Sequence, residues 1–160
     1  MRTRRSILGT LGCAVTIPTV GCTGFPVEYP DPGTKLVRLG LTNLGDSSHR
    51  FEIRVHRDGT VVHESAHDLG GDGESVSGTQ GACPWMDTSG SYVVAARLEG
   101  GEWVSQSVDE GVDGSPEHVL VHVLYDGWEG ERLAFLIEPG EEPDGPSAER
   151  CHLEPAPGDD

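Results

Sequence analysis

The most constraining feature of the chain is an alternation of apolar and polar residues with a period of two, between residues 34 and 138. This period is typical of strands that bury one face, whereas amphipathic helices repeat their apolar residues every three to four positions. Glycine-rich pairs such as Asp58-Gly59 and Gly100-Gly101 separate the alternating runs. The alternating residues are Val37, Leu39 and Leu41; Phe51, Ile53 and Val55; Tyr92, Val94, Ala96 and Leu98; and Val119, Val121, Val123 and Tyr125.

The clearest single element is a β-hairpin closed on Asp58-Gly59. This pair tolerates the positive φ angles of a type I′ turn. A two-residue turn fixes the register, so that Val55 lies opposite Val62. We therefore expect Val62 to face the core, and His63 and His67 to project toward solvent, where they matter little for folding.

The other runs complete an all-β domain. A second hairpin is expected around Gly100-Gly101, joining residues 91–99 to residues 102–108, and the apolar run 133–137 predicts a further strand. Six or seven short antiparallel strands in about 105 residues, 34–138, predict an Ig-like β-sandwich. The cysteine spacing does not match the antibody-domain signature, so the prediction covers the architecture alone.

The N-terminal residues resemble an export signal followed by a membrane anchor. Arg4 and Arg5 form the pair of a twin-arginine signal. The apolar run that follows is too short to span a bilayer as a helix. It ends at Cys22, in a sequence that resembles the lipobox of prokaryotic lipoproteins. We expect residues 1–21 to be removed as a twin-arginine lipoprotein signal peptide and Cys22 to be lipidated.

Two proline-rich segments flank the predicted domain. Residues 22–33 are expected to form a tether, which could hold the domain roughly 35 Å from the membrane at about 3.1 Å per residue. Residues 139–160 form an acidic tail, whose composition is typical of disorder. Cys151 lies within this tail, so part of the tail is expected to be pinned to the domain.

Four cysteines divide into two groups. Cys13 lies in the signal and Cys22 is the lipid site, which leaves Cys83 and Cys151 in the exported domain. An even pair in an exported domain indicates one disulfide. Closing this loop would stabilise the fold by roughly 4 kcal/mol in the chain-entropy model. Two independent thiols are the alternative.

The charge of the mature chain is strongly negative. From Cys22 onward the chain has 8 bases and 27 acids, a net charge of −19, and Lys35 is its only lysine. Such self-repulsion is relieved in molar salt, where the Debye length falls to about 3 Å. The composition resembles that of proteins from extremely halophilic archaea, an acidic secreted mesophilic protein being the alternative. Nucleic acid is not an expected partner, because it requires basic patches.

A family resemblance is carried by two segments. They are Leu41-Thr-Asn-Leu44 and the hairpin from His49 to His63. With the signal, they resemble small haloarchaeal twin-arginine-exported lipoproteins, in which a strand ending in Thr-Asn precedes a hairpin closed on Asp-Gly. The resemblance implies an Ig-like domain and carries no catalytic residue, because most such proteins have no established role.

One segment matches a catalytic motif. The sequence His63-Glu64-Ser65-Ala66-His67 is H-E-x-x-H, the motif of zinc metalloproteases. On a helix, residues four apart lie about 6 Å from each other and can bind one Zn²⁺. On a strand they lie about 13 Å apart. The hairpin places the motif on a strand, so we expect no metal site here.

Other candidate sites are weaker. His118 and His122 alternate with valines and are expected on the solvent face of a strand. Cys83 has no histidine nearby in the sequence, which argues against blue copper. The acidic loops 68–74 and 109–113 lack the spacing of a Ca²⁺ loop. Three tryptophans could pack in the core or anchor a partner: Trp85, Trp103 and Trp128.

These features predict a non-catalytic binding or structural module on the outer face of the cell membrane. We expect no cofactor and no catalytic or metal-binding residue. The expected partners are the membrane, through the lipid on Cys22, and a surface protein. The alternatives are a small zinc-dependent hydrolase that uses His63, Glu64 and His67, or an accessory subunit of a membrane complex.

Overall fold

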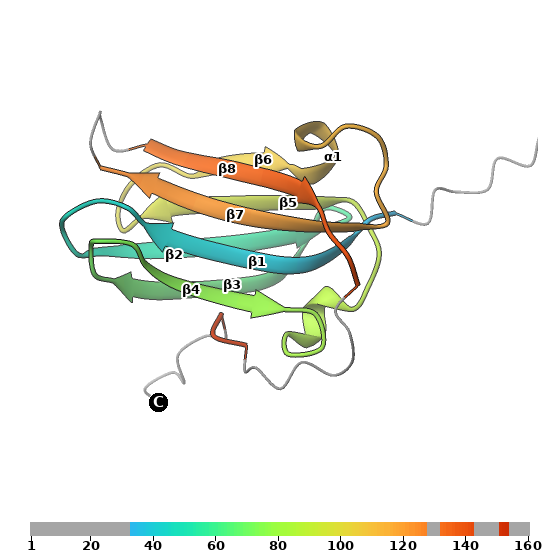
Figure 1. Cartoon of the computed structure of the whole chain (residues 1–160), viewed down its shortest axis with the longest axis horizontal. Coiled ribbons are helices and arrows are strands. Elements are labelled where there is room, and N and C mark those ends of the chain that lie inside the picture. Colours follow the sequence, from blue (N-terminus) through green and yellow to red (C-terminus); the bar gives the residue numbers. More distant parts are fainter. Residues whose placement is uncertain (1–32, 128–131, 143–150, 154–160) are drawn as a thin grey trace, which may run out of the picture.

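The computed structural model describes residues 33–127, 132–142 and 151–153. These residues form two four-stranded sheets that pack face to face, which confirms the predicted β-sandwich (Figure 1). The front sheet in Figure 1, here the β1 sheet, has the order β4-β1-β7-β8, and the β2 sheet behind it has the order β3-β2-β5-β6. The strands are β1 Lys35–Asn43, β2 His49–Arg57, β3 Thr60–Leu69, β4 Glu74–Thr79, β5 Tyr92–Leu98, β6 Val104–Ser107, β7 His118–Asp126 and β8 Arg132–Pro139.

Strand β4 is the element that the sequence did not indicate. Its residues read Glu-Ser-Val-Ser-Gly-Thr, with Val76 as the only large apolar side chain. The strand therefore lacks the alternation, hairpin turn or apolar run that indicated the other seven. It forms because β1 offers a free edge, along which Arg38 to Asn43 pair with β4 in antiparallel register.

The sheets are not wholly antiparallel, because β1 pairs with β7 in parallel. A parallel pair requires a long crossover connection, and strands β2 to β6 supply it. The two expected hairpins are present, β2 with β3 and β5 with β6.

The core lies between the sheets and is built from the alternating residues of the central strands. Phe51 and Tyr125, one from each sheet, meet edge to face with ring centroids 5.4 Å apart. Such aromatic contacts stabilise beyond the area they bury. The fully buried alternating residues are Leu39 and Leu41; Phe51, Ile53 and Val55; Tyr92, Val94 and Ala96; and Val119 and Val123.

Two single-turn helices lie at the end of the sandwich where β1 and β7 begin (Figure 1). The 3-10 helix η1, Pro84–Met86, buries Met86, and α1, Val108–Gly111, buries Val108. The C-terminal segment 151–153 lies beside β4, where the Leu153 side chain is fully buried and the His152 N–H donates to the Ser77 carbonyl. Part of the acidic tail is thus held against the domain, as expected.

Several predictions concern residues outside the described part of the chain. The export signal with Arg4 and Arg5, the lipid site Cys22, the tether up to residue 32, and Trp128 all lie there.

Candidate functional site

The H-E-x-x-H segment lies on strand β3 and has the geometry of a strand. Glu64 is exposed on the outer face of the β2 sheet, where Arg54 donates two hydrogen bonds to its carboxylate, of 3.0 and 3.1 Å. The pKa of Glu64 is lowered by this hydrogen bonding. His63 and His67 project from the opposite face of the same strand. The glutamate therefore cannot act as a general base beside a metal held by the two histidines, as the metalloprotease motif requires.

A β-bulge overturns the expected register of the hairpin. The turn itself is as expected, with positive φ at Asp58 (51°) and Gly59 (78°). Two pairs further on, however, Val55 lies opposite His63, and Val62 is an extra residue. One extra residue moves every later side chain of the strand to the other face. The prediction that His63 faces solvent is therefore wrong: its exposed fraction is only 7%.

The cost of burial explains why the bulged register is preferred. Without the bulge, the acidic side chains of Glu64 and Asp68 would face the core. Carboxylates are ionised near pH 7, and an unpaired buried charge is very costly, whereas an imidazole is already largely neutral there. The observed register therefore brings in residues that can enter the core uncharged: His63, Ser65, His67 and Leu69.

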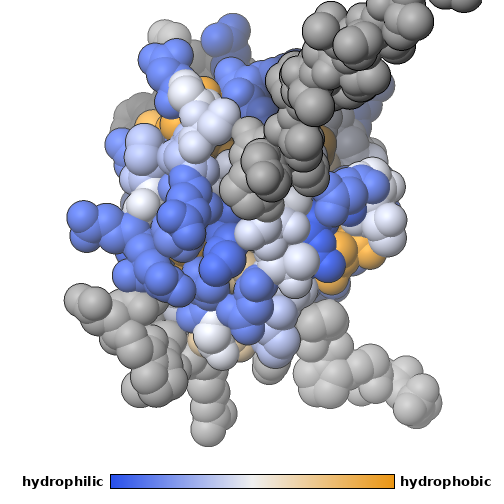
Figure 2. All heavy atoms as spheres, turned by 90° about the vertical axis from the view of Figure 1, so that its right-hand side faces the viewer, coloured by the Kyte–Doolittle hydropathy of each residue, from blue (hydrophilic) through white to orange (hydrophobic). Residues whose placement is uncertain are grey.

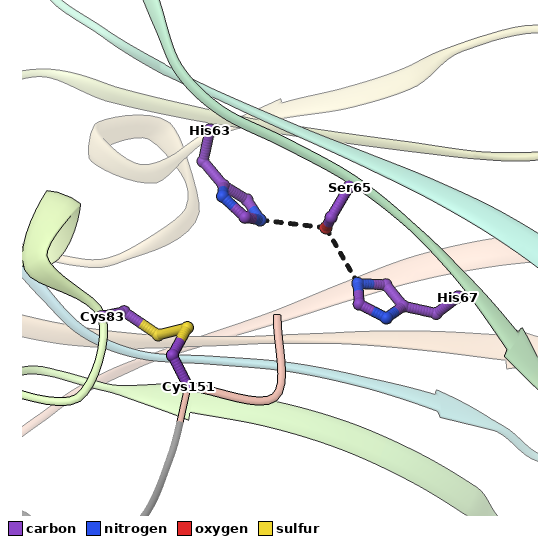
Figure 3. The surroundings of a disulfide bond; sticks show 5 residues. All are labelled: His63, Ser65, His67, Cys83 and Cys151. Atoms are coloured by element: carbon purple, nitrogen blue, oxygen red, sulfur yellow. Dashed lines mark hydrogen bonds between the residues drawn. A yellow bond between two sulfur atoms is a disulfide. The ribbon is translucent and has the colours of Figure 1, made fainter. Parts of the chain in front are cut away.

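The inward side chains of β3 form a hydrogen-bonded group, which we call the histidine–serine cluster: His63, Ser65 and His67. The Ser65 Oγ lies 2.9 Å from the His63 Nε2 and 2.8 Å from the His67 Nε2 (Figure 3). With both rings neutral, the hydroxyl donates to one imidazole and accepts from the other. The two rings converge on one oxygen, so the expectation that strand spacing holds these imidazoles about 13 Å apart is also wrong.

Burial keeps both imidazoles neutral near pH 7. Desolvation lowers the pKa of His63 from 6.5 to about 4, and the second cause is electrostatic repulsion from His67 when that ring is also protonated. The pKa of His67 is also lowered, first by desolvation and then by the nearby Arg50 guanidinium, while Asp68 opposes the shift. Both groups therefore lose more by being charged inside the sandwich than they gain from their neighbours.

The cluster lies on the side of the sandwich that the disulfide closes. Trp85, from η1, stacks on the His63 ring with centroids 4.8 Å apart and planes at 14°. Cys83, which precedes η1, is bonded to Cys151, and their Cα atoms are 5.1 Å apart, so the expected pairing is present. Figure 3 shows the disulfide and the cluster on the same side of β3. A Cβ atom at Gly78 would lie 2.3 Å from the Cys83 sulfur, so only glycine fits under the bridge.

The cluster has few chemical options in this conformation. A serine beside an imidazole is the usual arrangement of a nucleophile and its base. Ser65, however, is only 5% exposed, so a substrate has no route to its oxygen. Within the described residues, no three His, Cys, Asp or Glu side chains are grouped so that they could hold a metal ion.

The outer face of the β2 sheet is ionic. The Arg97 Nε donates to Glu52 at 2.9 Å, and Arg50 pairs with Asp68 at 2.7 Å. The guanidinium groups of Arg54 and Arg97 lie 4.5 and 4.6 Å from the ring centroid of Trp103. Trp103 is thus neither core nor free surface but a half-buried ring against two cations, a contact that depends on strand pairing and has no sequence signature.

A polar cleft of about 600 Å³ lies at the end of the sandwich where β1 and β7 begin. Ser91 holds its two carboxylates in place, since its N–H donates to Asp58 at 2.9 Å and its hydroxyl donates to Asp109 at 2.8 Å. Figure 2 shows that this end is covered mainly by hydrophilic residues. These hydrogen bonds stabilise the turns and give the two exposed carboxylates a structural role.

The two histidines of β7 lie on the outer face of the β1 sheet, as expected, although both are half-buried. The His122 Nε2 is 2.7 Å from the Thr42 hydroxyl. Its ring lies directly over Gly40, where a Cβ atom would approach the ring to 2.9 Å. Gly40 therefore gives His122 room to lie flat against the sheet.

Comparison with known protein families, curated proteins and solved structures found no match to the chain. Among the described residues, no helix is long and apolar enough to cross a bilayer.

Proposed function

We propose that this protein is a non-catalytic binding or structural module, displayed on the outer face of the cell membrane by a lipid on Cys22. The proposal has two parts, location and chemistry. The location is supported by the residues of the signal and by the length of chain between Cys22 and Gly33.

One observation carries the chemical part. Glu64 and the two histidines of the H-E-x-x-H match lie on opposite faces of β3, and the histidines hydrogen-bond to Ser65 inside the sandwich. A zinc hydrolase needs an open coordination position and a base beside it. The cluster offers neither, so a structural role for these side chains fits the geometry better than hydrolysis.

The location is tested by fractionating cells that express two variants of the protein. Replacing Cys22 with Ser should leave export intact and move the protein from the membrane fraction into the medium. Replacing Arg4 and Arg5 with Lys should retain the protein inside the cell. A Cys22→Ser protein that stays on the membrane would contradict the lipid anchor, and normal export of the arginine variant would contradict the twin-arginine route.

The chemistry is tested by metal analysis of the protein purified from membranes. We expect less than stoichiometric zinc after dialysis, and the same content in the Glu64→Gln variant. One equivalent of tightly held zinc, with peptidase or esterase activity that Glu64→Gln abolishes, would establish the hydrolase in its place.

A further inference from the structure

The outer face of the β1 sheet differs from the rest of this acidic molecule. At its centre lie two rows of uncharged residues that run across all four strands, and this is the surface turned toward the viewer in Figure 1. We call it the neutral face. Its members are Ser77, Gly40, His122 and Leu136 in one row, and Ser75, Thr42, Leu124 and Ala134 in the next.

The neutral face is partly apolar and open. Leu136 is 47% exposed, among the most exposed large apolar side chains of the described residues, and Ala134 beside it is also exposed. Burial, and then the charge of Arg38, lowers the pKa of His122 below 6.5, so its ring adds no charge at pH 7. A surface of this kind is unusual in a mature chain with a net charge of −19.

Charged residues border the neutral face at both ends of the strands. Arg38 and Glu138 lie in the row beyond His122, since both flank Leu120 across the sheet. Arg132 lies at the opposite end of β8, six residues from Glu138 and on the same side of the strand, and Asp126 of β7 lies beside it in the same row. All four side chains are exposed, and β8 itself carries opposite charges at its two ends.

We propose that the neutral face binds a second copy of this chain, as a symmetric dimer whose two-fold axis runs across the strands. This axis places β8 against β8 of the other copy in the opposite direction. Glu138 of each copy then faces Arg132 of the other, and the row containing His122 faces the row containing Leu124. The contact uses the same patch on both copies, as a closed two-fold interface requires.

Charge selects this occupant and this surface. Two chains that each carry −19 repel one another through most of their surfaces, and the centre of the neutral face is free of acids. The opposite sheet is less suitable, because its outer face is covered by carboxylates paired with Arg50, Arg54 and Arg97. A copy docked there would have to break those pairs or bury them.

The size of the face sets the strength of the dimer. Four strands and seven residues span roughly 19 Å by 20 Å. The area of the face is therefore below the about 800 Å² per partner of a standard stable interface. We accordingly expect a weak dimer, with a dissociation constant on the order of 10–100 μM. High salt should strengthen the dimer, because it screens the repulsion between the acidic surfaces.

The test is sedimentation of the exported protein in molar salt, over a range of concentrations from 1 μM to about 1 mM that brackets the expected constant. The Cys22→Ser background removes both the lipid and a thiol that could cross-link copies. In this background the protein should be dimeric at the upper end of the range. Leu136→Glu should raise the dissociation constant at least about tenfold, the effect of 1.4 kcal/mol. Val104→Glu, an equally exposed position (43%) on an edge strand of the other sheet, should leave it unchanged.

A charge exchange tests the orientation of the two copies. Glu138→Arg alone and Arg132→Glu alone should each weaken the dimer, and the double variant should restore it. A protein that is monomeric at every concentration, or one that Val104→Glu weakens as much as Leu136→Glu, would overturn the proposal. Two weakened single variants without rescue in the double variant would overturn this two-fold arrangement.

Discussion

Strands β2 and β3 are neighbours in one sheet and face the same core, yet they fill it in different ways. The inner face of β2 consists of Phe51, Ile53 and Val55, all fully buried. The inner face of β3 brings His63 and Ser65 to the same depth. The β2 side is held by apolar burial, and the β3 side by hydrogen bonds, a stacked tryptophan and a covalent bridge.

The difference shows how much one residue in a strand can decide. The side chains of β3 alternate between two faces, and the bulge at Val62 selects which of these two sets of side chains faces the core. Both sets contain polar groups. The sheet takes the set whose groups can be neutral and can bond to each other. Trp85 stacks on His63, and the disulfide lies on the same side of β3 as the cluster, so both lie against this polar inner face.

The largest expected effect lies on the β2 side. Phe51→Ala should destabilise the protein by about 3–5 kcal/mol, because it removes a fully buried ring and leaves a cavity between the sheets. Chemical denaturation in high salt measures the change. Val61→Ala is the control, since this side chain is 46% exposed and should cost less than about 0.5 kcal/mol. A similar loss of stability for both variants would mean that Phe51 does not lie in the apolar core.

On the β3 side, the corresponding test removes the covalent bridge. Replacing Cys83 and Cys151 with Ser should cost roughly 4 kcal/mol, because the bridge spans 68 residues and its loss frees the unfolded chain. Alkylation of the folded wild-type protein without reductant should label neither cysteine, as mass spectrometry can show. Quantitative labelling of both cysteines would contradict the bridge.

Acid should weaken the β3 side selectively. The unfolded state binds a proton at His63 with the ordinary pKa of 6.5, and the folded state does so only at about 4. Between these values the unfolded state binds more protons, so stability falls as the pH is lowered and the loss is complete below about pH 4. The expected loss from His63 is about 3 kcal/mol, since one unit of pKa corresponds to about 1.4 kcal/mol, and His67 acts in the same direction.

Denaturation at a series of pH values tests this, with His63→Phe as the comparison variant. Phenylalanine keeps an aromatic ring against Trp85 but cannot titrate, so its stability should depend less on pH between 6.5 and 4. An equal slope for both proteins would show that other groups cause the acid sensitivity.

The smallest expected effect comes from the shared hydroxyl. Ser65→Ala leaves two buried imidazoles without their common partner, and an unsatisfied buried polar group costs about 1–3 kcal/mol. The exposed Ser105 on β6 offers a matched serine-to-alanine control with little expected effect. If the Ser65 variant is as stable as the control, the cluster does not hold β3 in its register.

Local patterns in the sequence were sufficient for the architecture. Four alternating runs, the hairpins expected at Asp58-Gly59 and Gly100-Gly101, and one apolar run together indicated seven of the eight strands, because strand periodicity and turn chemistry depend on neighbouring residues alone. Strand β4 was missed for the same reason: with one large apolar residue it has no alternation, and only the free edge of β1 makes it a strand.

The sequence by itself determined the β-sandwich, the hairpins and the cysteine pair available for a bridge. Only the tertiary structure decided which side of β3 faces the core, and therefore that His63 and His67 point inward. The turn fixed a register that was correct for two residue pairs, after which the bulge reversed every side chain. That reversal depends on whether carboxylates or imidazoles cost more free energy to bury beneath β4 and the disulfide. This cost is set by the packing of several segments against one another, so no single segment of the sequence determines it.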